Sequence, residues 1–198
     1  MRLSKFRKIL RLTFVAALLS AAEAVMIKAP LSDLVEGAEA IVLGRVQSLQ
    51  CTWSLDQSLI VTIVTFKVQE VLKGPVSGPL IILQIPGGLI GDIGLKVSDT
   101  PSFRQDEKAL IFLKMLKDPN SPKNSHLAAQ NSRSAYEVFE RAQGKFAIDE
   151  AGMAEVSGYE LPYRDNKAEK PLPLTELKTK IKALLRRAPS SRGKSHEK

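Results

Sequence analysis

Of the 198 residues, 29 are basic and 21 are acidic, which gives a formal net charge of +8. The excess lies at the two ends: residues 25–163 contain 13 basic and 16 acidic side chains, and residues 164–198 contain 11 basic and 4 acidic ones. A nucleic-acid-binding surface needs basic and aromatic side chains together on the folded body, so this composition argues against nucleic acid as a partner.

The amino terminus has the pattern of a signal peptide. Five basic residues precede the apolar run Leu12–Ala22, and Ala22-Glu23-Ala24 has the small-x-small form that signal peptidases cleave. We therefore predict that residues 1–24 are removed, that the protein is exported to the periplasm or the extracellular space, and that no transmembrane span remains. The alternative is an uncleaved membrane anchor, for which the apolar run is short.

The next segments predict a short helix followed by a strand. Residues 30–37 form the helix, and Ser32 has the side chain of a typical N-terminal cap. Residues 40–51 form the strand, in which Gly44 interrupts the side-chain surface. A glycine at such a position is typical of the bend or bulge that small barrels use.

The stretch Ser58–Gly74, SLIVTIVTFKVQEVLKG, predicts the central strand of the fold because it is long, β-branched and alternating. Phe66 lies on the side of this strand that we expect to face the core, whereas Lys67 lies on the other side. A strand of this length in a small domain usually bends or closes into a barrel. Residues 52–57 form the preceding loop, which contains Trp53, the only tryptophan of the chain.

A glycine-rich stretch, PGGLIGDIG, follows the next predicted strand, Pro79–Pro86. No Gly-Lys-Ser/Thr follows it and no helix opens there, so a phosphate-binding loop is not indicated. The glycines, among them Gly87 and Gly88, indicate a β-hairpin instead.

Three groups of elements are predicted beyond the hairpin. Residues 109–116, ALIFLKML, are nearly all apolar and predict a strand covered on both faces. Shorter strands are predicted at residues 135–140, 145–149 and 153–156, with a helix as the alternative for residues 128–143. Thr175 caps a helix that runs to Arg187 with one apolar stripe.

These elements predict a mainly β fold, a small closed or partly open antiparallel β-barrel with a short N-terminal helix and a C-terminal amphipathic helix. Residues 25–163 form the barrel domain, and residues 164–187 form a linker and a helix packed on it. Residues 188–198 form a disordered basic tail.

A set of short motifs resembles a family of uncharacterised bacterial exported proteins. In chain order the motifs are Gly44-Arg45-Val46, Trp53 in the next loop, Leu72-Lys73-Gly74, Pro86-Gly87-Gly88, Pro101-Ser102-Phe103, Asp106-Glu107, Leu110 to Leu113 and Gln143-Gly144-Lys145-Phe146. The resemblance implies a barrel similar to oligonucleotide/oligosaccharide-binding (OB) folds and netrin-like domains. Because its motifs lie mostly at turns and core positions, it implies no catalytic residue.

The residue inventory argues against several kinds of chemistry. Two histidines, His126 in a predicted loop and His196 in the tail, and a single cysteine do not suffice for a metal site, and no cofactor is expected. No G-x-S-x-G motif accompanies a serine, so no catalytic residue is assigned. Cys51 cannot form an internal disulfide. A buried thiol is its simplest interpretation, and the choice between a monomer and a Cys51-linked dimer stays open.

Because the residues for metal, cofactor and serine-based chemistry are missing, the sequence favours a non-enzymatic binding module. This module would contact a protein or glycan of the cell envelope or the secreted fraction. The predicted binding residues are Trp53, Gly87, Gly88 and Asp92, from the loop and the hairpin. A buried Trp53 that closes the barrel end is a competing interpretation. Two further functions stay open: an envelope structural component held by its basic tail, and a small hydrolase whose loop carboxylates, Asp92, Asp99, Asp106 and Glu107, meet.

Overall fold

The computed structural model describes residues 28–54, 57–76, 78–116, 135–156 and 170–187. The predicted signal peptide, most of the predicted linker and the basic tail lie outside the described residues, as do His126 and residues 128–134. The predictions for these segments stay predictions.

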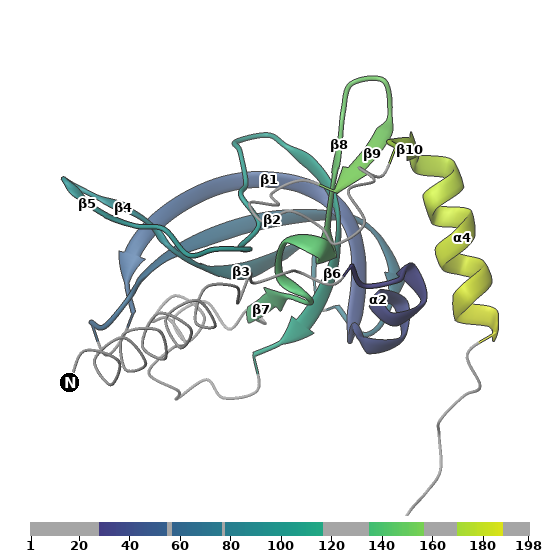
Figure 1. Ribbon diagram of the computed structural model, residues 1–198, viewed down its shortest axis with the longest axis horizontal. Helices are drawn as coiled ribbons and strands as arrows, with labels where there is room; N and C mark the ends of the chain where they lie inside the picture. The colour runs from purple at the N-terminus through teal and green to yellow at the C-terminus, as the bar shows by residue number, and fades with distance from the viewer. Residues whose placement is uncertain (1–27, 55–56, 77, 117–134, 157–169, 188–198) are drawn as a thin grey trace, which may run out of the picture.

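Five strands close into a small barrel (Figure 1). Each strand pairs with the next in the order β1 (Ala40–Trp53), β2 (Ile60–Lys73), β3 (Leu80–Pro86), β7 (Ala135–Val138) and β6 (Lys108–Met115), and β6 pairs with β1. The predicted mainly β fold with a small closed barrel is thus confirmed, and five strands are also the number in OB-fold barrels. One expectation changes, because β3 and β7 are parallel. An odd number of strands cannot close a ring with every pair antiparallel.

The barrel interior is filled by the side chains of one face of each strand. Phe66 is completely buried there, as predicted, and Lys67 beside it on β2 is exposed. The other interior residues include Val42, Val46, Val64, Ile81, Leu83, Ala109, Ile111, Leu113 and Tyr136. Alternation with a period of two therefore identified the core-facing side of the central strand correctly.

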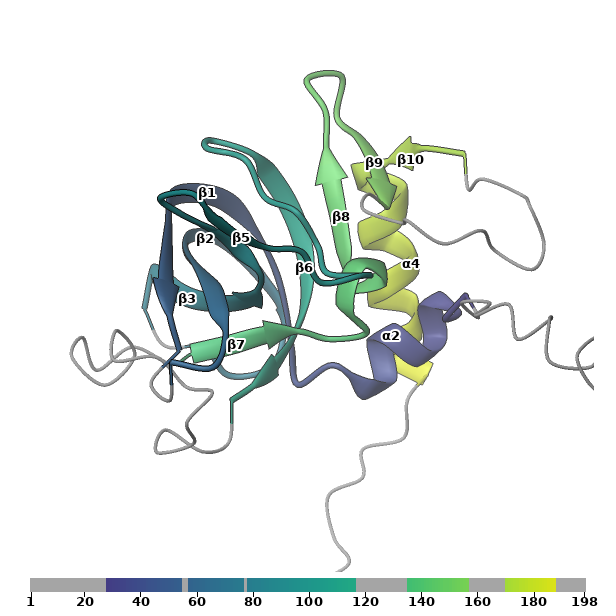
Figure 2. The same ribbon diagram turned by 60° about the vertical axis from the view of Figure 1, so that its left-hand side comes forward.

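A second apolar core lies outside the barrel, on the outer faces of β1 and β6. Phe112 of β6 is completely buried in it, and residues 109–113 are buried on both faces of the strand as predicted. The end of the predicted strand is not covered, because Met115 is 38% exposed. The covering elements are α2 (Leu31–Gly37), α4 (Leu174–Arg187), β8 (Lys145–Ile148), β9 (Met153–Val156) and β10 (Leu172–Pro173). Figure 2 shows α2, α4, β8 and β9 on this side of β6. Leu177 and Ile181 of α4 are buried there, which places the apolar stripe of the helix against the barrel wall.

Gly44 lies at an irregularity in β1, where the register with β2 shifts between Leu43 and Gly44. A Cβ atom on Gly44 would lie 2.2 Å from the carbonyl oxygen of Lys67 and 2.6 Å from Cε1 of Phe66. The two strands therefore approach at this point more closely than any other residue allows, and the predicted bulge is confirmed.

Two predicted helix caps are wrong. Helix α2 begins at Leu31 with Pro30 at the N-cap position, and the Ser32 hydroxyl donates to the carboxylate of Asp33 instead. The C-terminal helix begins at Leu174, so Thr175 lies within its first turn. In both cases the helix begins one residue before the residue predicted to cap it.

Two further boundaries also differ from the prediction. Trp53 is the last residue of β1 rather than part of a loop, since it pairs with Ile60 across the β1–β2 ribbon. Residues 135–138 form β7, and Arg141–Gly144 form a short 3₁₀ helix, η1, so the α-helix considered there is absent from residues 135–143. Strand pairing with β6 and β3 overrides a sequence that is not strongly β-branched.

Candidate binding site

The glycine-rich stretch forms the predicted β-hairpin. Its strands are β4 (Gly88–Ile90) and β5 (Ile93–Leu95), joined by a two-residue turn at Gly91 and Asp92. Gly91 has φ of +57°, which favours glycine. The hairpin extends beyond the barrel as an arm beside the ends of β1 and β2 (Figure 1).

Gly87 and Gly88 attach the base of this arm to the paired strands β1 and β2. The Gly87 N–H donates to the carbonyl oxygen of Ile60 at 2.8 Å, and the hydroxyl of Thr62 donates to the carbonyl oxygen of Gly87 at 2.7 Å. A Cβ atom on Gly88 would lie 2.7 Å from Sγ of Cys51, and φ at Gly88 is +146°. Both glycines therefore act through the backbone, by allowing a close approach that a side chain would prevent.

A cavity of about 650 Å³ lies between the hairpin and the barrel, within the size range of ligand pockets. We call it the mouth cavity. Its apolar lining comprises Leu49, Ile85, Pro86, Leu89, Leu95, Val97, Pro101 and Phe103, and its polar lining comprises Thr62, Lys96, Thr100 and Ser102, with Gly87, Gly88 and Gly94. The wall therefore combines both strands of the hairpin, the barrel interior and the segment that follows β5.

The polar groups of the mouth cavity are few and partly engaged. The Thr62 hydroxyl donates to the carbonyl oxygen of Gly87, and the Thr100 hydroxyl donates to the carbonyl oxygen of Val97 at 2.8 Å. Among the described residues that line the cavity, Lys96 is the one ionisable side chain, and none is a carboxylate. The cavity is thus suited to an apolar group accompanied by a neutral or negatively charged one.

A second cavity of about 350 Å³ lies next to the first. Ile85, Pro86, Val97, Thr100 and Pro101 line both, so the end of β3 and the segment after β5 border the two spaces. Glu137 and Arg141 line the second cavity from the side of β7 and η1.

A buried lysine, Lys145, contacts the residues that form the wall of the mouth cavity. Lys145 is 1% exposed, and its Nζ donates to the carbonyl oxygen of Ser102 and, at 2.6 Å, to Oε1 of Glu107. The same Nζ lies 4.5 Å from the ring centroid of Phe103. Burial lowers the pKa of Lys145, and the neighbouring Glu107 opposes that shift. Ser102 and Phe103 are therefore fixed by a charged group that the cavity does not expose.

Sequence reasoning did not assign Lys145, Glu107 or Phe103 to the site. A signal was present, however, because these residues belong to three of the motifs that carry the family resemblance. The motifs Pro101-Ser102-Phe103, Asp106-Glu107 and Gln143-Gly144-Lys145-Phe146 are separate in sequence and meet at the Lys145 ammonium. Motifs of this kind lie at turns and core positions, where close packing restricts which side chains fit.

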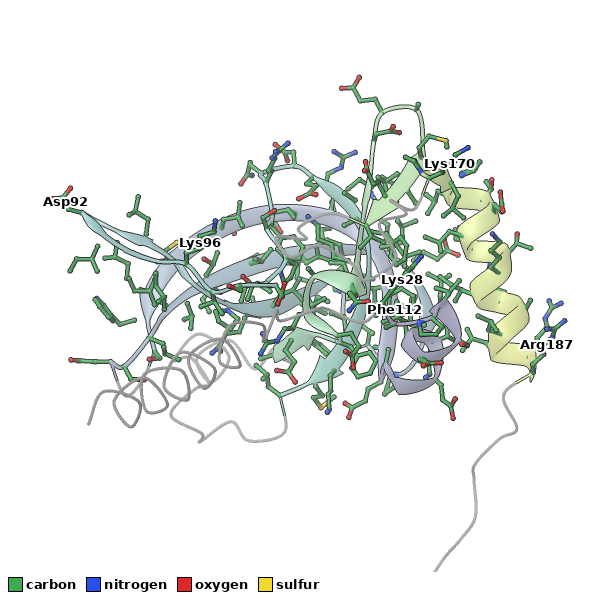
Figure 3. The ribbon with its side chains drawn as sticks, in the orientation of Figure 1. Lys28, Asp92, Lys96, Phe112, Lys170 and Arg187 are labelled. Carbon is green, nitrogen blue, oxygen red and sulfur yellow. The ribbon has the colours of Figure 1, made fainter. Side chains whose placement is uncertain are left out.

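The predicted binding residues end up in three different places. Gly87 and Gly88 line the mouth cavity. Trp53 lies at the end of β1 with 40% of its surface exposed, so it is not a buried plug of the barrel end. Asp92 lies at the tip of the arm, away from the barrel (Figure 3). Of the predicted binding residues, Gly87 and Gly88 therefore line the mouth cavity, whereas Trp53 and Asp92 do not.

Other apolar side chains of the arm are exposed to solvent. Leu89 is 64% exposed and Ile93 is 58% exposed, which makes them the most exposed of the large apolar side chains in the described residues. Cys51 lies under the base of the arm. It is half-buried rather than fully buried, with its Sγ 3.5 Å from Oγ1 of Thr62.

None of the four carboxylates that would serve a hydrolase lines either cavity described above. Glu107 is paired with Lys145, and Asp92 is at the tip of the arm. Asp99 and Asp106 are absent from the lining of both cavities described above, although Oδ1 of Asp99 is buried without a hydrogen-bond partner.

Neither helix in the part of the chain that the structure describes is long and apolar enough to cross a bilayer. Among the same residues, no three His, Cys, Asp or Glu side chains gather in a way that could hold a metal ion. No protein-family model matches the chain, and a comparison with curated proteins found no match either.

Proposed function

We propose that the protein is a non-enzymatic binding module whose site is the mouth cavity together with the β4–β5 arm. The observation that carries this proposal is the cavity of about 650 Å³, walled by an arm that exposes Leu89 and Ile93. Exposed apolar patches beside a cavity are typical of surfaces that contact a partner. The described lining of the cavity contains no carboxylate, and its one ionisable side chain is Lys96. A hydrolase that uses paired carboxylates is therefore not favoured there, and binding is favoured over turnover.

The partner is a protein or glycan of the cell envelope or the secreted fraction. This part of the proposal depends on export, which the basic and apolar pattern of residues 1–24 supports. Sequencing the amino terminus of the protein recovered from its producing cell tests it directly. A chain that begins at Val25 is expected, and a chain that still begins at Met1 in the membrane fraction contradicts it.

Affinity capture from envelope and secreted fractions tests the binding site. Leu89→Ser removes an exposed apolar side chain from the cavity wall. Val71→Ser is the matched control, because Val71 is 45% exposed on β2 and does not line the mouth cavity. We expect the Leu89 variant to lose partners that the wild type and the Val71 variant retain.

Trp53→Ala extends the experiment to the end of β1. If Trp53 belongs to the same contact surface, this variant loses the same partners as Leu89→Ser. Unchanged capture by the Leu89 variant contradicts the proposed site, and turnover of a glycan or peptide library by the purified protein contradicts the non-enzymatic function.

A further inference from the structure

The outer edge of the β4–β5 arm has the features of a strand that pairs with another chain. In the described residues, β5 pairs with β4 alone, and β4 lies between β5 and the β1–β2 ribbon. Natural edge strands are blunted by short length, charged side chains, proline or bulges. β5 is short, with three residues, and Lys96 follows it, but no proline, bulge or charged side chain lies within Ile93–Leu95, where Ile93 is exposed.

The main-chain groups of this edge follow from the turn. In a hairpin with a two-residue turn, the residues that flank the turn exchange hydrogen bonds, so Ile90 and Ile93 form such a pair. The alternation along an antiparallel strand then directs the N–H and C=O of Gly94 away from β4, toward the open edge. Gly94 is therefore the centre of the edge that a further strand would meet.

The sequence around Gly94 is complementary to itself when two copies run antiparallel. With Gly94 opposite Gly94 of the second copy, Asp92 faces Lys96, and Ile93 faces Leu95. Two such pairs of each kind form because the arrangement is two-fold symmetric. Asp92 and Lys96 are exposed and oppositely charged, and Ile93 and Leu95 are apolar. Direct opposition of this kind stabilises an antiparallel pair.

We propose that two copies of this chain associate through β5, in an antiparallel, two-fold symmetric pairing centred on Gly94. The paired arms form a four-stranded sheet in the order β4–β5–β5–β4. This pairing covers the exposed side chain of Ile93 with Leu95 of the second copy and gives the Gly94 main chain its hydrogen-bond partners. It uses residues of the arm, among them Leu95 and Lys96 that also line the mouth cavity, so the two proposals share this surface. It does not involve Cys51.

The contact is small, because each copy contributes a strand of three residues and its two charged neighbours. Stable interfaces bury roughly 1,200–2,000 Å², so we expect a weak dimer that forms in the micromolar to millimolar range. Sedimentation velocity of the full chain over about 10 µM to 1 mM covers that range. A reducing buffer excludes a disulfide through Cys51.

Charge reversal at the two facing positions tests the register. Asp92→Lys and Lys96→Asp each replace two attractive pairs by two repulsive ones, so each is expected to weaken the dimer about tenfold or more. The double variant with both reversals restores opposite charges and is expected to return to within about threefold of wild type. Lys67→Asp is the matched control, because Lys67 is exposed on β2 and the same change there leaves the arm intact.

A second variant addresses the main chain. Gly94→Pro removes the outward N–H at the centre of the proposed pairing, and proline on an edge strand blocks further pairing. This variant is expected to remain monomeric over the same concentrations, with a thermal unfolding midpoint that shows the barrel is intact.

Three results overturn the proposal. The first is a wild-type protein that stays monomeric at the highest concentration. The second is a dimer that the single charge reversals do not weaken, which would place the contact elsewhere. The third is a double reversal that stays as weak as the single ones, because the two positions would then not face each other.

Discussion

Oε1 of Glu107 lies 2.6 Å from Nζ of Lys145, and the two side chains are 16% and 1% exposed. The pair joins the turn before β6 to the start of β8, and the Lys145 ammonium also lies over the ring face of Phe103. A buried ion pair of this kind need not stabilise the fold more than apolar residues would, but losing one partner leaves an uncompensated charge.

Glu107→Gln is therefore expected to lower the free energy of unfolding by about 3 kcal/mol, because the ammonium of Lys145 keeps its burial and loses its counter-charge. Lys145→Met combined with Glu107→Gln is expected to cost clearly less than the sum of the two single variants. Urea denaturation of all four proteins measures the coupling. Additive effects would show that the two groups do not interact.

The pKa of Lys145 leads to a prediction at alkaline pH. Burial lowers this pKa from its ordinary value of 10.5. Between the lowered value and 10.5 the unfolded chain binds more protons than the folded one, so the contribution of Lys145 to stability rises with pH in that window. The difference in unfolding free energy between wild type and Lys145→Met is expected to shift in favour of wild type as pH approaches 10.5. A constant difference would contradict the assignment.

Helix α4 is joined to β2 through Glu70, which accepts a hydrogen bond from Lys178 and lies 3.6 Å from Nζ of Lys182. The Lys178 hydrogen bond is the main cause that lowers the pKa of Glu70 from its ordinary value of 4.5. The stability that this group contributes is present above 4.5 and is lost as pH falls through the lowered value. Glu70→Gln and Lys178→Met are each expected to flatten this acid-side loss, measured by urea denaturation at a series of pH values. An unchanged pH profile in both variants would argue against the contact.

Lys73 closes the C-terminal end of helix α2. Its Nζ donates to the carbonyl oxygens of Val35 at 2.6 Å, Glu36 at 3.0 Å and Ala38 at 2.6 Å. Lys73→Met is expected to cost about 1–2 kcal/mol, because a cation at a helix C-terminus satisfies carbonyl groups that lack intrahelical partners. Lys67→Met on the exposed face of the same strand is the control, and it should leave thermal stability within about 0.5 kcal/mol of wild type.

Gly44→Ala is expected to destabilise the barrel by about 3 kcal/mol, because its Cβ would meet main-chain and ring atoms that cannot move apart without breaking the β1–β2 pairing. Gly94→Ala is the matched control, since the nearest atom to a Cβ there is Cδ1 of Leu89 at 3.5 Å. Thermal unfolding at low protein concentration compares the two. Similar midpoints for both variants would show that the bulge can relax.

The period-two patterns of the sequence determined the strands and their inner faces. They correctly placed Phe66 inside the barrel and predicted that residues 109–113 are buried on both faces, because the alternation of side chains along a strand is a local property of the backbone. The hairpin was also predicted from local sequence. Its glycines Gly87 and Gly88, which line the mouth cavity, lie in a turn-rich stretch between apolar runs.

Only the tertiary structure decided which segments meet. Trp53 joins β1 because it pairs with Ile60, although its local surroundings are those of a loop. Lys145 and Glu107 are 38 residues apart. Both belong to motifs that the sequence singles out, but no local pattern shows that these motifs meet or that the lysine is buried against Phe103. Closure of five strands likewise forces one parallel pair, which no local pattern contains. Strand pairing and burial depend on contacts between distant segments, and these contacts exist only once the barrel has closed.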